Sequence, residues 1–153
     1  PLNQVEKVSR YLCQGFVGLF YEQTEELKLR QVAKETDVFF DFDSYSSQEK
    51  SSIEIRALSE VVFLEFPKEN EEMVIKRYPD FAHLGILVNH RIQKRLTDQM
   101  AVFSLPLIEG VPKLCALYPG IERFLHYQDW ADLFSTSPRT VGRVFSEINK
   151  ERK

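Results

Sequence analysis

The chain has 153 residues, of which 43% are hydrophobic and 28% are charged, a composition typical of a globular domain and not of a disordered chain. The formal net charge of −3 excludes a polycation that binds nucleic acid over its whole surface, so such binding would need a local basic patch. Two distant cysteines, Cys13 and Cys115, exclude a disulfide framework, a zinc-finger site and an iron–sulfur cluster. The sequence shows neither a signal peptide nor a run of about 18 apolar residues, which predicts a cytoplasmic protein without a membrane contact.

Short strands are predicted over the first part of the chain. Residues 15–21 are rich in β-branched and aromatic side chains, the polar residues 22–26 predict a hairpin turn, and residues 27–32 alternate like a half-buried strand. Further strands are predicted at residues 11–13, 38–42, 53–57 and 61–66. The polar, short-chained residues 43–52 predict a loop. Many short strands at regular spacing favour a small antiparallel barrel or roll.

Helical patterns begin at Pro67. Residues 67–78 predict a short helix, Pro79 interrupts it, and residues 80–104 predict a long helix. At 1.5 Å per residue this helix would be about 35 Å long. Its apolar side chains recur every four residues: Leu84, Val88, Ile92, Leu96 and Met100. This stripe either packs along a second copy of the helix in a dimer, as in a short coiled coil, or packs on the roll of its own chain.

Beyond Pro106 the chain returns to short elements. Gly110 and Pro112 predict irregular structure, and residues 112–118 predict a short helix that Pro119 ends. Residues 121–125 then lead into the segment 127–148, which predicts two short helices joined by a tight turn.

The second helix of this pair has distinct faces. Ser137 is a good N-cap and Pro138 fits the first helical position. The apolar stripe consists of Val141, Val144, Phe145 and Ile148, and another face carries Arg139, Arg143, Ser146 and Lys150. Residues 137–153 hold five basic side chains, Arg152 and Lys153 among them, against two acidic ones. The pattern alone fits both a helix-turn-helix that reads DNA and a structural helical pair with a solvated charged face.

Four short motifs occur in this order of elements: Glu54-Ile-Arg-Ala-Leu58, Tyr78-Pro-Asp-Phe81, Arg95-Leu-Thr-Asp-Gln-Met100 and Ser137-Pro-Arg-Thr-Val-Gly-Arg143. With them the chain resembles the Crp/Fnr family of bacterial transcription regulators, and more narrowly the short, cyclic-nucleotide-binding-like regulators of Bacteroidetes. The resemblance implies an α+β fold with three parts. These are an N-terminal double-stranded β-roll at residues 1–78, a dimerisation helix at 79–104 and a C-terminal helix-turn-helix domain at 105–153. The last part would be winged-helix-like with a short or absent wing, and the roll is expected to lack its opening strands.

The resemblance also implies roles for individual residues. Arg139 and Arg143 would read base edges, because the planar guanidinium matches guanine O6 and N7. Ser137, Thr140 and Gln128 would contact phosphate, and Lys150 would add to the DNA-binding surface. The dimer interface would consist of Leu84, Val88, Ile92, Leu96 and Met100. Two protomers would then bind a pseudo-palindromic site on double-stranded DNA.

Some positions depart from the family pattern. Family members that bind cyclic nucleotides carry Phe-Gly-Glu followed by Arg-Ser/Thr-Ala, whereas this chain has Phe39-Phe-Asp-Phe-Asp43 and Lys50-Ser-Ser-Ile53. The Gly-Glu pair and the arginine are both missing, which disfavours cyclic AMP and predicts no bound cofactor. Lys50, Ser51 and Ser52 are the candidate ligand residues for an unknown small-molecule effector. Ser135 stands where the turn of the family usually has glycine.

The sequence thus predicts a homodimeric, sequence-specific DNA-binding transcription regulator. The alternative is a dimeric sensing or interaction module that has lost DNA binding. An enzyme is not expected, because the three histidines, His83, His90 and His126, are scattered and show no metal-ligand spacing.

Overall fold

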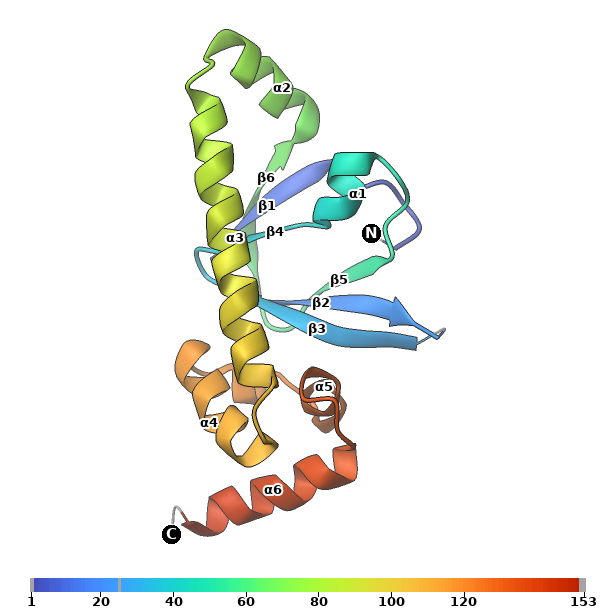
Figure 1. Ribbon diagram of the computed structural model, residues 1–153, viewed down its shortest axis with the longest axis vertical. Coiled ribbons are helices and arrows are strands. Elements are labelled where there is room, and N and C mark those ends of the chain that lie inside the picture. The colour runs from blue at the N-terminus through green and yellow to red at the C-terminus, as the bar shows by residue number, and fades with distance from the viewer. Residues whose placement is uncertain (1, 25, 152–153) are drawn as a thin grey trace.

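The computed structural model describes residues 2–24 and 26–151, which follow one another as a strand-rich part, a long helix and a group of short helices (Figure 1). Within these residues, the strands form two three-stranded antiparallel sheets. One sheet has the order β4 (Val38–Phe39), β1 (Val8–Gln14), β6 (Val62–Pro67). The other has the order β3 (Glu26–Lys34), β2 (Phe16–Gln23), β5 (Ile53–Ala57).

The strand-rich part has a small apolar core of its own. The buried side chains that form it come from both sheets: Leu12, Val17, Leu19, Ala33, Phe39 and Ile53. Most of the predicted strands are confirmed, but the strand predicted at 38–42 is shortened to β4.

The loop predicted at 43–52 is wrong in its first half, because α1 (Phe42–Ser47) forms there. The side chain of Asp41 accepts hydrogen bonds from the backbone N–H groups of Asp43 and Ser44, at 3.1 and 3.2 Å. This N-cap starts a short helix in a segment whose polar composition favours a loop, and Tyr45 becomes buried.

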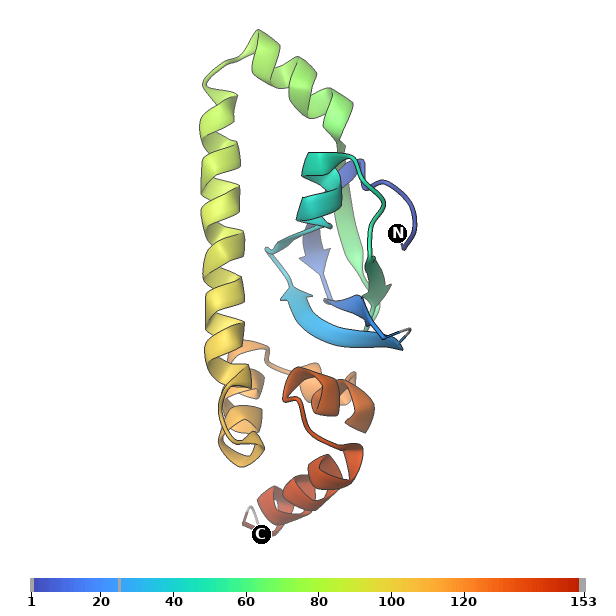
Figure 2. The same cartoon turned by 45° about the vertical axis from the view of Figure 1, so that its right-hand side comes forward.

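Two helices connect the sheets to the C-terminal part. The short helix α2 (Lys68–Arg77) and the long helix α3 (Phe81–Phe103) confirm the predicted pair. Residues 81–87 are all exposed, and the first half of α3 stands away from the sheets (Figure 2) except at its start, where the Phe81 ring lies 6.4 Å from the Phe66 ring of β6, between centroids. The second half packs on the molecule and buries Arg95, Gln99 and Val102.

The C-terminal helices share one core with the outer face of the β2–β3 sheet. These helices are α4 (Leu107–Leu117), the 3-10 turn η1 (Ile121–Arg123), α5 (Tyr127–Leu133) and α6 (Pro138–Glu151). From the sheet, Phe20, Leu29 and Val32 join this core, and Trp130 and Val141 are among its helical members. The helical group is therefore packed against the strand-rich part.

The irregular structure predicted at Gly110 and Pro112 is wrong, because helix α4 forms there. The helix runs continuously through both residues. It buries Leu107, Val111 and Leu114 on one side, and this burial outweighs the low helix propensity of proline and glycine. Gly110 has a packing function, because a Cβ built on it would lie 2.1 Å from Cε1 of Phe134.

We expect opposite effects from two glycine-to-alanine substitutions in helices. Gly110→Ala should lower the free energy of unfolding by about 1–3 kcal/mol, because the new methyl group would displace the Phe134 ring. Gly85→Ala is the matched control in α3, where a Cβ would have no atom within 4 Å, and it should raise that free energy by about 0.5–1 kcal/mol. Urea denaturation followed by circular dichroism measures both. A Gly110→Ala variant as stable as Gly85→Ala would contradict this packing.

Candidate nucleic-acid interface

Helix α6 begins as the sequence predicts. The Ser137 hydroxyl accepts a hydrogen bond from the Thr140 N–H at 3.2 Å, and Pro138 is the first residue of the helix. Val141 and Val144 are buried, and the Phe145 ring meets the Trp130 ring edge-on with centroids 5.3 Å apart. This predicted apolar stripe fixes the rotation of α6 against α5 and so decides which face is exposed.

The turn between α5 and α6 requires a left-handed residue. Ser135 has a φ of 49°, and the Thr136 N–H donates to the Ala131 carbonyl at 2.9 Å, which closes the end of α5. The resemblance placed Ser135 where related chains carry glycine, and its φ confirms that this position needs the conformation that glycine adopts without strain.

The outer face of α6 points away from the rest of the molecule, at the end opposite α2 (Figure 1). It carries Arg139, Arg143, Ser146 and Lys150, all of which are exposed. Within the described part of the chain, none of the three basic side chains forms an ion pair with a carboxylate. Arg152 and Lys153, which the sequence counts with this basic group, lie outside the described residues. The exposed cations of α6 are thus available to an anionic partner.

The predicted phosphate-binding residues flank this face. The Ser137 and Thr140 hydroxyls lie 3.0 Å apart, and the exposed Gln128 donates from Nε2 to Oδ1 of Asp132 at 2.8 Å. Ser137 and Thr140 thus lie together at the start of α6, and Gln128 lies on the first turn of α5. The phosphate contacts of these three residues stay a prediction.

Asp132 anchors α5 to the β-sheet, a role that the sequence analysis missed. Its Oδ2 accepts a hydrogen bond from the Leu29 N–H of β3 at 3.2 Å, and its carbonyl accepts one from Nη1 of Arg30 at 3.1 Å. The residue is buried between Ala131 and Leu133. The sequence contains one indication of this role, a carboxylate among the apolar residues of a short helix, because a buried carboxylate needs a hydrogen-bonding partner.

We expect Asp132→Ala to lower the free energy of unfolding by about 1–3 kcal/mol, because the buried N–H of Leu29 loses its acceptor. Asp132→Asn is the matched control, since its amide oxygen can still accept from Leu29. Chemical denaturation compares the two, and backbone amide exchange at Leu29 locates the effect. Equal stability of the two variants would show that the hydrogen bond does not hold α5 in place.

The residues predicted to form the dimer interface are spread around α3. Leu84 is 46% exposed and Met100 is 71% exposed, whereas Val88, Ile92 and Leu96 are half-buried. Ile92 and Leu96 line a hollow between α3 and the strand-rich part. Ile86 is 66% exposed and is not a member of the predicted stripe.

The hollow that Ile92 and Leu96 line has a volume of about 160 Å³. Its lining contains two carboxylates, Asp41 and Asp43, and one cation, Arg95, and we call it the acidic hollow. Burial, followed by the charges of these two aspartates, raises the pKa of Tyr21 in its wall to about 12. Carboxylates on the wall oppose the binding of a phosphate group.

The candidate ligand residues lie elsewhere, at the entry to β5. Lys50 and Ser52 are exposed, and Ser51 is buried with its hydroxyl bonded to the backbone of Ile53. None of the three belongs to the lining of the hollow beside α3. Their predicted role in effector binding stays a prediction.

Metal-binding clusters and membrane spans are two further features that the described residues lack. Residues 2–24 and 26–151 contain no group of His, Cys, Asp and Glu side chains placed to hold a metal ion. The helices within these same ranges also include none with the length and apolarity needed to span a lipid bilayer.

No protein-family model matches the chain, and no curated protein matches its sequence. Solved structures do match. The c-di-GMP-responsive regulator CLP from Xanthomonas campestris has a TM-score of 0.71 at 15% identity, over 97% of this chain and 80% of that chain. FixK2 from Bradyrhizobium japonicum has a TM-score of 0.71 at 13% identity, over 95% and 76%. A CRP-family transcriptional regulator from Thermus thermophilus has a TM-score of 0.70 at 14% identity, over 98% and 80%.

CLP and the Thermus protein are regulators, and the identity of all three neighbours to this chain is low. At such identity the likeness concerns the arrangement of the backbone. The chain therefore has the α+β fold of Crp/Fnr-type transcription regulators.

Proposed function

We propose that this protein is a sequence-specific DNA-binding transcription regulator of the Crp/Fnr type that acts as a homodimer on a pseudo-palindromic site. The observation that carries the proposal is the outer face of α6, where Arg139 and Arg143 are exposed and no ion pair engages them among the described residues. The shared fold with transcription regulators supports the same conclusion.

In this proposal α5 and α6 act as a helix-turn-helix, with α6 as the recognition helix in the major groove. Arg139 and Arg143 are four residues apart and lie on one face, so both can reach base edges along the groove. Each guanidinium can donate two hydrogen bonds to O6 and N7 of a guanine. Ser137 and Thr140, at the N-terminus of α6, are in the place where helices bind phosphate. Lys150 adds a charge about two turns beyond Arg143.

A net charge of −3 restricts how such a protein binds. The chain as a whole has no net positive charge to attract DNA, so binding depends on local cations such as those of α6. A second copy would double the contact and set the spacing of two half-sites at about one DNA turn.

The dimer is proposed to form along α3, but along a different set of residues from the predicted stripe. Exposed or half-exposed positions with alternating spacings of four and three residues follow one face of α3. They are Ala82, Ile86, Asn89, Gln93, Leu96 and Met100, here called the α3 seam. Such alternation is the heptad pattern by which two helices pair over their whole length. Leu84, Val88 and Ile92 of the predicted stripe fall outside this alternation, whereas Leu96 and Met100 belong to both sets.

For DNA binding we expect Arg139→Ala and Arg143→Ala each to weaken binding by about 1–3 kcal/mol and to relax sequence preference at one base pair. Duplexes enriched from a random pool by the wild type provide the probe, and fluorescence anisotropy measures the affinity. Arg77→Ala is the control, because Arg77 is also exposed but lies on α2.

The double variant Arg139→Ala/Arg143→Ala decides the assignment. If it binds the enriched duplex as tightly as Arg77→Ala does, α6 is not the reading helix. If the wild type enriches no duplex and is still a dimer, the chain is a sensing or interaction module without DNA binding.

For the dimer we expect Ile86→Glu and Met100→Glu to shift the protein toward the monomer, because each places two charges face to face in the α3 seam. Sedimentation equilibrium measures the dissociation constant, which should rise by at least about tenfold. Met73→Glu is the control, since Met73 is equally exposed but lies on α2. A wild-type chain that sediments as a monomer at high concentration would refute the dimer.

A further inference from the structure

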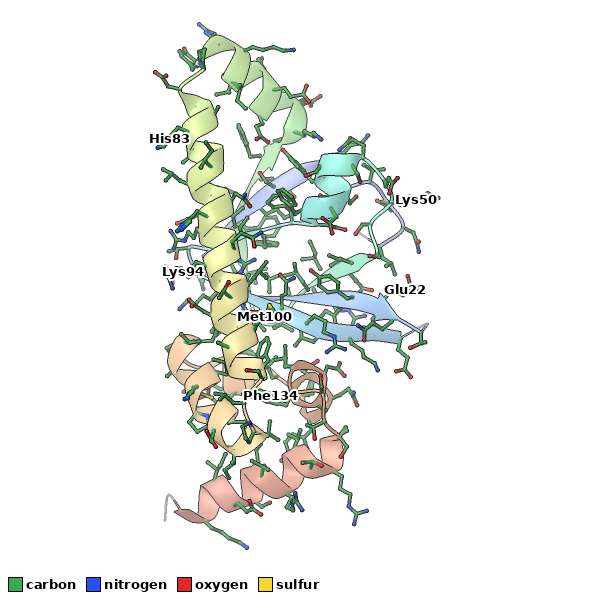
Figure 3. All side chains as sticks on the ribbon, in the orientation of Figure 1. Glu22, Lys50, His83, Lys94, Met100 and Phe134 are labelled. Atoms are coloured by element: carbon green, nitrogen blue, oxygen red, sulfur yellow. The ribbon has the colours of Figure 1, made fainter. Side chains whose placement is uncertain are left out.

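A second cavity of about 160 Å³ also borders α3; it shares Arg95 with the acidic hollow, but its lining has more cations than carboxylates. Three parts of the molecule meet there. Lys34 and Asp37 come from the end of β3 and the turn after it, and Leu117 and Tyr118 come from the end of α4. The second half of α3 supplies the remaining lining residues: Arg91, Lys94, Arg95 and Asp98. Lys94 marks this stretch of α3 in Figure 3.

The cavity has surplus positive charge. Among the described residues its lining carries four cations and two carboxylates. Two of the cations have carboxylate partners, Lys94 with Asp98 at 2.9 Å and Arg95 with Asp37 at 3.7 Å. The other two, Lys34 and Arg91, form no ion pair within the described part of the chain. The charge left over is that of two cations.

The two surplus cations are held by neutral partners. Lys34 Nζ donates to the Leu117 carbonyl at 2.6 Å and lies 5.2 Å from the centre of the Tyr118 ring. Arg91 Nη2 donates to the Thr36 hydroxyl at 2.6 Å. These bonds keep both groups at the cavity but leave their charge uncompensated.

Arg95 is the buried cation of the lining. It is only 9% exposed, and its Nε is a buried donor without a hydrogen-bonding partner among the described residues. Its Nη1 already donates to the Val38 carbonyl at 2.9 Å. Arg95 also lines the acidic hollow, so the positive charge that is free for an anion in this cavity is that of Lys34 and Arg91.

We propose that this cavity binds a small phosphate-bearing anion. A phosphate group carries a charge of about −2 near pH 7 and several strong acceptor oxygens, which matches the two surplus cations, Lys34 and Arg91. The cavity is smaller than the sites of about 300–1,000 Å³ that hold drug-sized ligands, so it suits the phosphate group and little more. This site differs from the acidic hollow, and its occupancy does not require DNA binding.

An anion here would link the parts that meet at the cavity. It would neutralise Lys34 at the end of β3 and Arg91 on α3, while Lys34 also binds the last turn of α4. Binding would therefore stabilise the junction between the strand-rich part and the helical group, and thermal stability should rise with phosphate concentration.

Inorganic phosphate is the probe for the test, titrated into the whole chain by calorimetry at constant ionic strength in chloride. We expect saturable binding of one phosphate per chain, with amide NMR shifts at Thr36, Arg95 and Tyr118. Arg91→Gln should weaken the binding by about tenfold or more, because one charge-assisted hydrogen bond is lost. Arg91 is exposed, so this substitution leaves the packing unchanged. Lys34→Gln should act in the same direction.

Two control variants separate this site from other basic groups. Arg77→Gln removes the same charge from α2, and Arg139→Ala removes one from α6; both should keep the wild-type affinity for phosphate. The proposal is overturned if the wild type shows no saturable binding, if Arg77→Gln weakens it as much as Arg91→Gln, or if the NMR shifts cluster on α6. A failure of DNA binding would leave these results unchanged.

Discussion

The amide of Gln99 is the interaction on which the relative placement of the parts depends. This side chain is 1% exposed. Its Oε1 accepts from the Val32 N–H at 3.2 Å, and its Nε2 donates to the Val32 carbonyl at 2.6 Å and to the Tyr118 hydroxyl at 2.5 Å. Because β3 is an edge strand, the Val32 peptide groups would otherwise be buried without partners. The Gln99 side chain of α3 thus satisfies the backbone groups of Val32 at the sheet edge and also binds Tyr118, the residue that ends α4.

A β-bulge allows the same edge to hold α5 as well. Along a regular strand, outward-facing backbone groups recur at every second residue, so Leu29 and Val32 could not both face outward. The pairing of β2 with β3 skips Arg30, since Leu19 pairs with Gln31 and Phe20 with Leu29. The extra residue shifts the alternation of backbone groups along the strand. The backbone N–H groups of Leu29 and Val32 therefore both point to the helices.

These two anchor points determine where α6 lies. Gln99 fixes α3 and, through Tyr118, the end of α4, while Asp132 fixes α5. Phe134 then fills the place beside Gly110 of α4 and meets the Phe103 ring of α3 edge-on, at 5.6 Å between centroids. The outer face of α6 is consequently oriented by contacts with β3 that lie far from it in the sequence.

The sequence predicted best what local chemistry decides. The start of α6 depends on Ser137 and Pro138, which are neighbours, and its rotation depends on an apolar stripe that can be read directly. The second half of α4 agrees with the helix predicted at 112–118, but its first half was missed, because burial of its apolar side outweighs two unfavourable residues and burial is not visible in a sequence. The anchoring roles of Gln99 and Asp132 depend on partners that are 67 and 103 residues away in the sequence. No local sequence pattern could therefore predict these partners.

Helix α3 shows why an apolar stripe can mislead. A repeat of four residues advances by about 40° per step around a helix of 3.6 residues per turn, so from Leu84 to Met100 the stripe turns through about 160°. Its members must therefore face different partners, as their unequal exposure shows. Two helices that stay in contact along their length, as in a coiled coil, need alternating steps of three and four, which the α3 seam provides. Two of its positions, Asn89 and Gln93, are polar; polar groups at such positions cost stability but favour one register, because a shifted pair would leave an amide against an apolar neighbour.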